Sequence, residues 1–256
     1  PEADVYFAGS DQIWNPMFSN GKDPAFYLDF VQHGVRASYA ASFAVDEFPQ
    51  ALRQTTAQYL GRFDHIAVRE TSGLSVLKTL GITDAVSVLD PVFLLPRAQW
   101  AAMAERPEGC EEPYLLVYDF DNSASLRALA ERIAAETGWR IYSVLDLPYA
   151  ERCFSLCGPE TFLGLVQGAA FVLSNSFHAT AFSVIFEREF AVVKRTEKIN
   201  TRMRDFTALL GLSDHMITEI ASVPLHTDWT QVERRLAAEI LQSKAYIDEV
   251  LRDGEK

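Results

Sequence analysis

The sequence predicts an α/β protein in two halves, each built around a largely parallel sheet. Short apolar runs alternate with longer helical patterns along the 256-residue chain, and this repeated order is typical of parallel sheets. The polar segment Glu105–Pro113 carries two prolines and a glycine, which predicts a linker. One strand–helix set precedes this segment and another follows it. We therefore expect two Rossmann-like domains that meet between Pro96 and Pro113.

The predicted strands are runs rich in Val, Ile, Leu, Phe and Tyr, at Val5–Ala8, Ala37–Ala41, Ile66–Val68, Val86–Leu89, Tyr114–Tyr118, Ile141–Val144, Phe171–Leu173 and Phe190–Val193. The predicted helices lie near Phe48–Leu60, Thr71–Leu80, Ser123–Thr137, Pro159–Gln167, Thr180–Glu187 and Arg202–Leu210. An amphipathic segment at Trp229–Leu251 predicts a last helix that packs across the outside. The expected domains are residues 1–104 and 113–228, with a closing helix at 229–252.

Composition restricts the class of partner. The net charge of −12 at pH 7 disfavours nucleic-acid binding, which needs a basic surface, and requires that cations gather locally around any anionic ligand. We see no apolar run long enough to span a bilayer and no signal peptide, so we expect a cytoplasmic protein that is not integral to a membrane. Cys110, Cys153 and Cys157 are too few and too scattered for a disulfide framework, and we expect reduced thiols.

The most informative stretch is Phe171–Phe182, where an apolar strand ends, a polar turn follows and a helix begins near His178. Ser174, Asn175 and Ser176 lie where the first N–H groups of the helix are free, which suits either helix capping or anion binding. His178 lies where it could donate to an anion or transfer a proton. The alternative is a structural turn in which Ser176 caps the helix and His178 is an ordinary histidine.

A basic run follows the predicted strand Phe190–Val193, at its carboxyl end. Guanidinium groups suit phosphate and carboxylate oxygens, and a local excess of cations is notable in an acidic chain. A solvated helix face is the alternative. Against the single acid Glu197, the run contains Lys194, Arg195, Lys198, Arg202 and Arg204.

Charged side chains also end strands in the first half. Arg69 follows the strand Ile66–Val68, and Asp90 follows Val86–Leu89. Ligands of α/β folds bind beyond the carboxyl ends of strands, so both residues are site candidates. For Arg69 the alternative is an ion pair with Glu70 or Asp90; for Asp90 it is a turn that stops the strand.

The segment after the first predicted strand is polar. Asp11 and Gln12 could bind sugar hydroxyls, and Trp14 could stack on a sugar face; the alternative is a hydrogen-bonded loop with a packed tryptophan. Dinucleotide, P-loop and zinc motifs have no match in the sequence.

Several strings, in this order over Asp4–Leu212, together resemble the polysaccharide pyruvyl transferase family. They are GSDQIWNP at Gly9–Pro16, SYAASF at Ser38–Phe43, AVRE at Ala67–Glu70, VLDP at Val88–Pro91, GPETFL at Gly158–Leu163, SNSFHATAFSVIF at Ser174–Phe186 and NTR at Asn200–Arg202.

The resemblance implies two Rossmann-like domains arranged as in GT-B glycosyltransferases. Family members open with a further βα unit, so the N-terminal domain is expected to be incomplete in a chain that starts at Pro1. The implied donor is phosphoenolpyruvate, and the implied acceptor is a hexose or N-acetylhexosamine, free or lipid-linked. The product is a pyruvyl ketal of a polysaccharide precursor, made in the cytoplasm or at the inner face of the membrane. The implied reaction demands no metal and no organic cofactor.

The resemblance matches His178, Arg69, Arg195 and Arg202 to family residues, and the chemistry of the side chains suggests the roles of the others. His178 and Asp11 are expected to be catalytic, and His178 matches the histidine in the serine-rich turn of the family. Five residues are expected to bind the donor: Arg69, Asn175, Ser176, Arg195 and Arg202. Three are expected to bind the acceptor: Ser10, Gln12 and Trp14.

Two other functions fit the same pattern. A glycosyltransferase of similar fold would use a nucleotide sugar and would need an acid that holds the ribose hydroxyls in the C-terminal half. A non-catalytic, carbohydrate-binding relative would share the fold without the catalytic activity.

Overall fold

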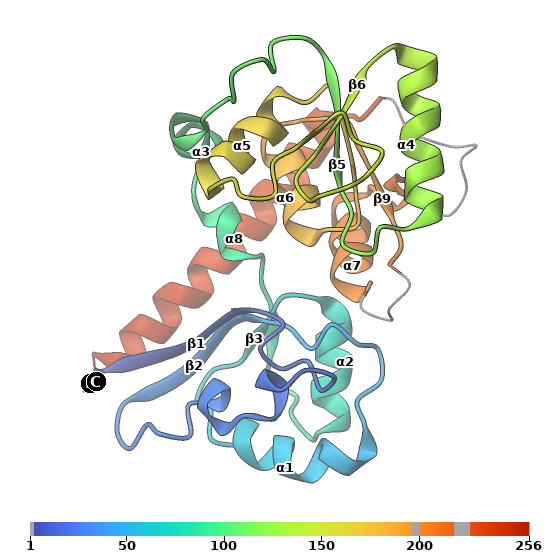
Figure 1. Ribbon diagram of the computed structural model, residues 1–256. Coiled ribbons are helices and arrows are strands. Elements are labelled where there is room, and N and C mark those ends of the chain that lie inside the picture. The colour runs from blue at the N-terminus through green and yellow to red at the C-terminus, as the bar shows by residue number, and fades with distance from the viewer. Residues whose placement is uncertain (1–2, 196–199, 218–225, 256) are drawn as a thin grey trace. The chain divides into compact units, whose positions relative to one another are not determined.

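The computed structural model describes residues 3–195, 200–217 and 226–255 (Figure 1). The chain divides into two compact units. The first unit comprises Pro1–Leu94, Lys198–Phe206 and Glu233–Lys256, and the second comprises Leu95–Glu197 and Thr207–Val232. Each unit has its own parallel sheet, so the α/β prediction with two sheets is confirmed.

The sheet of the first unit has four strands in the order β1-β2-β3-β4, all parallel. The strands are β1 Val5–Asp11, β2 Val35–Ala41, β3 Ala67–Val68 and β4 Val86–Ser87. Helix α1 Gln50–Leu60 connects β2 to β3, and helix α2 Thr71–Thr79 connects β3 to β4. Because every strand is parallel, the strand carboxyl ends lie along one edge of the sheet.

Two apolar clusters hold the first unit together. One includes Trp14 and Phe43 with residues of α1 and α2. The other joins the sheet to helix α8, Trp229–Gly254, through Tyr246 and Val250. The Tyr246 hydroxyl donates to the Ser38 carbonyl oxygen at 2.8 Å. The predicted last helix therefore packs on the sheet of the first unit, and its apolar face accounts for its amphipathic pattern.

The sheet of the second unit has six parallel strands in the order β10-β9-β8-β5-β6-β7. The strands are β5 Tyr114–Tyr118, β6 Arg140–Ser143, β7 Arg152–Cys153, β8 Phe171–Ser174, β9 Phe190–Val193 and β10 Met216–Ile217. Its helices are α3 Arg97–Met103, α4 Ala124–Thr137, α5 Pro159–Gly168 and α6 Phe177–Ile185, while α7 Thr201–Leu210 has residues in both units. Leu115, Leu173 and Ala191 of the central strands pack with Leu126 and Ile133 of α4.

Each predicted strand and helix is present; β5 and β9 have the predicted bounds, and the ends of the others differ by a few residues. Among the α-helices and strands of the described residues, α3, β7 and β10 were not predicted. Helix α3 contains no buried residue, and both residues of β7 are exposed. Neither element therefore has the apolar periodicity by which a buried helix or strand is recognised.

The predicted linker Glu105–Pro113 belongs to the second unit, because the division lies between Leu94 and Leu95. The Glu105 backbone is held against α5, where its N–H donates to the Glu160 carbonyl oxygen at 2.9 Å. Gly164 permits this approach, since a Cβ there would lie 2.1 Å from the Glu105 carbonyl oxygen. A polar composition typical of linkers therefore does not prevent this segment from packing.

Acidification should destabilise the protein partly through His215. Its ring is buried, and Nδ1 lies 2.9 Å from the Phe190 carbonyl oxygen. Burial lowers the pKa of His215 below its ordinary value, although the bond to Phe190 opposes this effect. In the unfolded chain this histidine is protonated near pH 6.5, whereas in the folded chain it stays neutral to a lower pH. The free energy of unfolding therefore decreases as the pH falls below about 6.5.

We expect His215→Gln to lose less stability than the parent between pH 7.5 and pH 5, measured by urea unfolding at each pH. The control is His33→Gln, because His33 is exposed. Equal pH dependence in the parent and in His215→Gln would contradict the assignment.

Candidate active site

Polar side chains gather at the carboxyl edge of the first sheet. Ser10 and Asp11 end β1, Arg69 directly follows β3, and Asp90 follows β4 by three residues. Arg202, in the first turn of α7, joins them as part of the same unit. The sequence prediction that Ser10, Asp11 and Arg69 lie at strand ends agrees with these positions. We call these five residues the strand-end cluster.

Arg69 is the buried centre of the strand-end cluster. Its side chain is 2% exposed, and Nη2 lies 2.8 Å from Oδ2 of Asp90. The same Nη2 donates to Oγ of Ser10 at 2.6 Å, and Oγ of Ser10 donates to Asp90 at 3.3 Å. The ion pair with Asp90 is the structural alternative named for Arg69. This ion pair also holds the guanidinium group in one orientation. The planar guanidinium group loses little conformational entropy when it pairs.

Asp11 is the exposed member of the strand-end cluster. Its side chain is 57% exposed, and Oδ1 lies 2.9 Å from Nη1 of Arg202 and 3.6 Å from Nη1 of Arg69. Its φ of 68° lies in the left-handed region, which costs free energy for a residue other than glycine. Two guanidinium groups therefore converge on one solvent-accessible carboxylate, in a backbone conformation typical of functional sites.

Trp14 has a different role from the one predicted. Its ring is fully buried, stacked on Tyr27 with 5.7 Å between centroids and tilted against Phe43 at 5.5 Å. Its Nε1–H donates to the Phe26 carbonyl oxygen at 3.1 Å. A ring enclosed in this way has no free face, so the predicted stacking on a sugar was wrong. Gln12 remains partly exposed, and its Oε1 accepts from Asn15 at 2.8 Å.

The basic run is divided between the two units. Arg204 forms a two-bond pair with Asp46 at 2.8 and 2.9 Å, and both side chains are largely exposed. Asp205 caps α2, since its Oδ2 accepts from the Ser72 N–H at 2.7 Å. Arg202 thus reaches the strand-end cluster, whereas Arg204 forms a surface ion pair. Lys198 lies outside the described residues.

In the second unit, the polar turn between β8 and α6 is held by internal hydrogen bonds. Ser176 is the N-cap of α6, and its side chain accepts from the Ala179 N–H at 3.4 Å. Asn175 donates from Nδ2 to Oδ1 of Asp119 at 2.6 Å and accepts from the Phe120 N–H at 2.9 Å. The capping role named as the alternative for Ser176 is therefore present, and the Asn175 amide is oriented by Asp119.

His178 lies in the first turn of α6 and is half-buried. Its ring meets that of Phe177 edge to face, with 5.5 Å between centroids. Its position near the amino end of a helix keeps it close to the positive end of the helix dipole. An imidazole in this place can donate to an anion or carry a proton.

Arg195 follows the end of β9 by two residues and pairs within the second unit. Its Nε and Nη2 lie 3.1 and 2.9 Å from Oδ1 of Asp121, and its guanidinium carbon is 5.2 Å from the centre of the Phe120 ring. Asp121 in turn donates its N–H to Asp119 at 3.0 Å. Asn175 and Arg195 are thus joined through the loop that follows β5.

For Asp90, the alternative prediction was a turn that ends the strand. Asp119 was not predicted as a site residue. Asp119 directly follows β5 and is buried, and its Oδ2 accepts from the Ser123 N–H at 2.8 Å. The signal that identified Arg69, a charged residue just past a buried strand, was present at Asp119 too.

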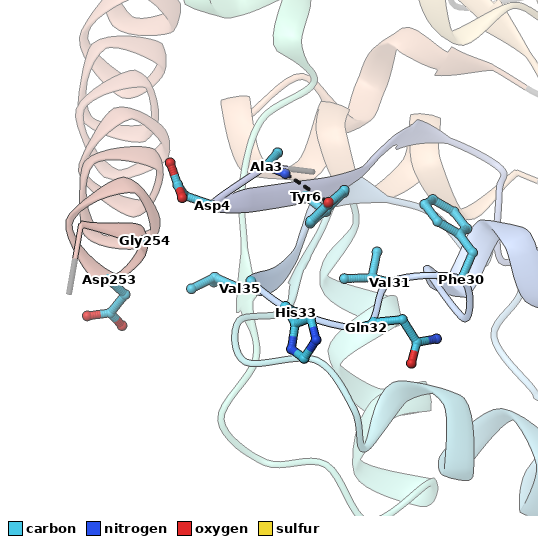
Figure 2. Close-up of a pocket in the computed structure, with 11 residues that line it drawn as sticks. Ala3, Asp4, Tyr6, Phe30, Val31, Gln32, His33, Val35, Asp253 and Gly254 are labelled. Atoms are coloured by element: carbon cyan, nitrogen blue, oxygen red, sulfur yellow. Dashed lines mark hydrogen bonds between the residues drawn. The ribbon is translucent and has the colours of Figure 1, made fainter. Parts of the chain in front are cut away.

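One pocket of about 780 Å³ lies away from the strand-end cluster (Figure 2). Its lining includes Asp4 and Tyr6 at the start of β1 and Gly34 and Val35 at the start of β2. Strand starts and strand carboxyl ends lie at opposite edges of a parallel sheet, so this pocket belongs to the other edge. In the described part of the chain, none of the helices has the length and apolarity needed to cross a bilayer.

Two solved structures have a similar fold at low sequence identity. One carries the name UDP-N-acetylglucosamine 2-epimerase and comes from Listeria monocytogenes; it is 13% identical, with a TM-score of 0.50 over 92% of this chain and 72% of that one. The other is an alpha,alpha-trehalose-phosphate synthase (UDP-forming) from Burkholderia vietnamiensis; it is 8% identical, with a TM-score of 0.50 over 91% of this chain and 71% of that one. At such identities the likeness shows the fold alone, a GT-B-like α/β arrangement as expected.

No curated protein matches this sequence. A family model does match: the one described as polysaccharide pyruvyl transferase aligns with residues 2–196, well over half of the chain. The match covers strands β1 to β9, the Ser10–Asp11 and Arg69–Asp90 parts of the strand-end cluster, and the polar turn with His178. The chain belongs to the polysaccharide pyruvyl transferase family.

Proposed function

We propose that this protein transfers the pyruvyl group of phosphoenolpyruvate to a pair of saccharide hydroxyls, forming a ketal. Membership of the family supports a transferase. The observation that carries the proposal is the convergence of Arg69 and Arg202 on Asp11, at 3.6 and 2.9 Å. Such paired guanidinium groups suit a small ligand with two anionic groups.

Phosphoenolpyruvate carries a phosphate and a carboxylate, and an acidic chain can hold it only where cations are gathered. The strand-end cluster contains two arginines, but also Asp11 and Asp90. Asp90 is buried and paired with Arg69, whereas Asp11 is exposed. An anionic donor would therefore displace the Asp11 carboxylate from Arg69 and Arg202 and leave the pair with Asp90 intact.

The reaction requires an acid, an anion clamp and a base. Protonation of the donor methylene carbon, assigned to His178, forms a methyl group and an oxocarbenium-like centre at C2. One saccharide hydroxyl attacks C2 and loses its proton to a base, a role that we assign to Asp11. Phosphate then leaves with the C2–O bonding electrons, and a second hydroxyl attacks C2 and loses its proton to close the ketal. Arg69 and Arg202 stabilise the anionic groups throughout.

Isothermal titration calorimetry with phosphoenolpyruvate tests the clamp. We expect Arg69→Ala to weaken binding by about tenfold to a hundredfold, because each charged hydrogen bond contributes roughly 1.5–3 kcal/mol. Arg69→Lys keeps a positive charge beside Asp90, so it should fold more readily than Arg69→Ala, but it lacks the paired N–H donors of the guanidinium group. Arg204→Ala is the matched control, since Arg204 pairs with Asp46 at the surface. Parent-like affinity in both folded Arg69 variants would contradict the clamp.

A glycosyltransferase that uses a nucleotide sugar is the second candidate, and the acids Asp119 and Asp121 near the end of β5 favour it. Such acids could hold ribose hydroxyls, although here they bond to Asn175 and Arg195. Thermal unfolding separates the candidates, since a ligand at 100 times its Kd stabilises the folded protein by about 2.7 kcal/mol. We expect stabilisation by phosphoenolpyruvate and none by UDP-sugars.

A further inference from the structure

Helix α2 receives its N-terminal cap from another helix. Its N-cap residue is Glu70, and within the described residues the Glu70 side chain makes no capping hydrogen bond. Asp205 of α7 supplies one instead: its Oδ2 accepts from the Ser72 N–H at 2.7 Å and from Oγ1 of Thr71 at 3.2 Å. A carboxylate at the N-terminus of a helix is favoured by the helix dipole. Asp205 therefore joins α7 to the start of α2, across 133 positions of the sequence.

The contact of Asp205 with α2 is largely shielded from water. The Asp205 side chain is 9% exposed, and hydrogen bonds to an ionised group are about twice as strong as neutral ones. The other oxygen, Oδ1, accepts from Nε of Arg204 at 2.8 Å. Arg204 also pairs with Asp46, but both of those side chains are largely exposed, and such surface pairs contribute little. Of these two attachments of α7 within the first unit, the one through Asp205 is the stronger.

Asp205 connects the elements that carry the two arginines of the strand-end cluster. Arg69 directly precedes Glu70, the N-cap of α2, and Arg202 lies three residues before Asp205 in α7. Residues three apart in a helix share a face, so the face of α7 that Asp205 attaches to α2 also carries Arg202. The attachment of α7 to α2 therefore determines where the Arg202 side chain begins relative to Arg69.

The two arginines are held in different ways. Arg69 pairs with buried Asp90 at 2.8 Å, so a residue of the neighbouring strand end fixes its guanidinium group. Arg202 reaches Asp11 from α7, at 2.9 Å. In the proposed function the donor displaces Asp11, which removes this contact from Arg202. Arg202 then stays in place only if α7 is held independently of Asp11, and Asp205 provides such an attachment.

We propose that Asp205 is a positioning residue: by capping α2 from α7, it holds Arg202 and Arg69 in the arrangement that binds the two anionic groups of the donor. The role assigned to Asp205 includes no contact with the donor. The inference rests on the proposed function for its effect on donor binding, and on the geometry of the first unit for its effect on Arg202. Loss of the cap should therefore weaken donor binding more than loss of the exposed ion pair on the same helix.

The test compares Asp205→Ala with Asp205→Asn by calorimetry with phosphoenolpyruvate, below the unfolding temperature of each variant. Alanine removes the cap, and affinity should fall by roughly 2- to 30-fold, the range for residues coupled to a site without contacting the ligand. Asparagine can still accept from the Ser72 N–H and is as good a helix cap as aspartate, so its affinity should stay close to that of the parent. Arg204→Ala and Asp46→Asn are the matched controls, because they break the exposed attachment of the same helix. Both should bind like the parent.

A double-mutant cycle shows whether Asp205 acts through Arg202. If it does, Arg202→Ala and the double variant Arg202→Ala/Asp205→Ala bind the donor equally weakly, whereas independent effects add. Additive losses would overturn the proposal. Parent-like affinity in Asp205→Ala, the result expected of a cap that only stabilises the fold, would also overturn it, as would an asparagine variant as weak as the alanine variant.

If Asp205→Ala does not fold, Asp205→Glu takes its place. Glutamate keeps the charge but is longer by one methylene group, so it should displace α7 from α2 and lower donor affinity in the same direction. Parent-like affinity in this variant would then contradict the positioning role.

The Nε–H signal of Arg202 in ¹⁵N NMR, identified from the Arg202→Lys spectrum, gives a readout that needs no donor. It should shift in Asp205→Ala and stay in place in Asp46→Asn. If the parent neither binds phosphoenolpyruvate nor reacts with it, the proposed function fails, and this signal alone decides whether Asp205 positions Arg202. An unshifted signal in Asp205→Ala would show that it does not.

Discussion

Asp11→Asn is expected to tighten the binding of phosphoenolpyruvate while lowering turnover by about 10²–10⁴-fold, the usual contribution of a positioned acid or base. The exposed Asp11 carboxylate lies against Arg202 and Arg69, so it competes with an anionic donor for both cations. Asparagine keeps the shape, loses the negative charge and cannot accept the proton of the acceptor hydroxyl. Affinity and turnover therefore move in opposite directions.

Calorimetry with phosphoenolpyruvate and initial rates of phosphate release measure the two quantities separately. Asp46→Asn is the matched control, because Asp46 is an exposed carboxylate paired with Arg204 outside the strand-end cluster. It should leave both quantities unchanged. Weaker donor binding in Asp11→Asn would show that the carboxylate does not compete with the donor. Unchanged turnover would remove Asp11 as the base.

His178→Gln is expected to lower kcat by about 10²–10⁴-fold with a small change in donor affinity, if the imidazole is the proton donor. An anion clamp at the same position would instead lose affinity and keep most of its turnover once the donor is saturating. Steady-state rates and calorimetry on the same variant separate these outcomes. The control His33→Gln replaces an exposed histidine at the opposite edge of the first sheet. Parent-like rates and affinity in His178→Gln would exclude both roles.

Much of the fold follows from apolar runs that parallel sheets bury on both faces. Strands β5 and β9 have the predicted bounds, because all residues of β9 and most of β5 are buried and the runs end at polar residues. Strand β7 could not be predicted, since its two exposed residues carry no alternation. The Glu105–Pro113 segment has a polar composition, yet Gly164 allows its backbone to pack on α5.

Some features of the candidate site could likewise be predicted from the sequence, and others could not. Arg69 and Asp11 were recognisable because a charged residue past a strand lies at the sheet edge where ligands bind. Which partner each side chain takes depends on residues distant in sequence: Arg202 reaches Asp11 across 191 positions. Trp14 was misassigned because tryptophan suits both a sugar platform and a core, and only the surrounding Tyr27 and Phe43 rings decide between them.

We propose that this protein forms pyruvyl ketals from phosphoenolpyruvate. The most direct measurement is ¹³C NMR of the protein incubated with [2-¹³C]phosphoenolpyruvate and a panel of hexose and N-acetylhexosamine glycosides. We expect the signal of a quaternary ketal carbon to appear, with one phosphate released for each ketal formed, and to be absent with His178→Gln. A folded protein that binds the saccharides but leaves phosphoenolpyruvate unchanged, or forms glycosides from UDP-sugars instead, would contradict it.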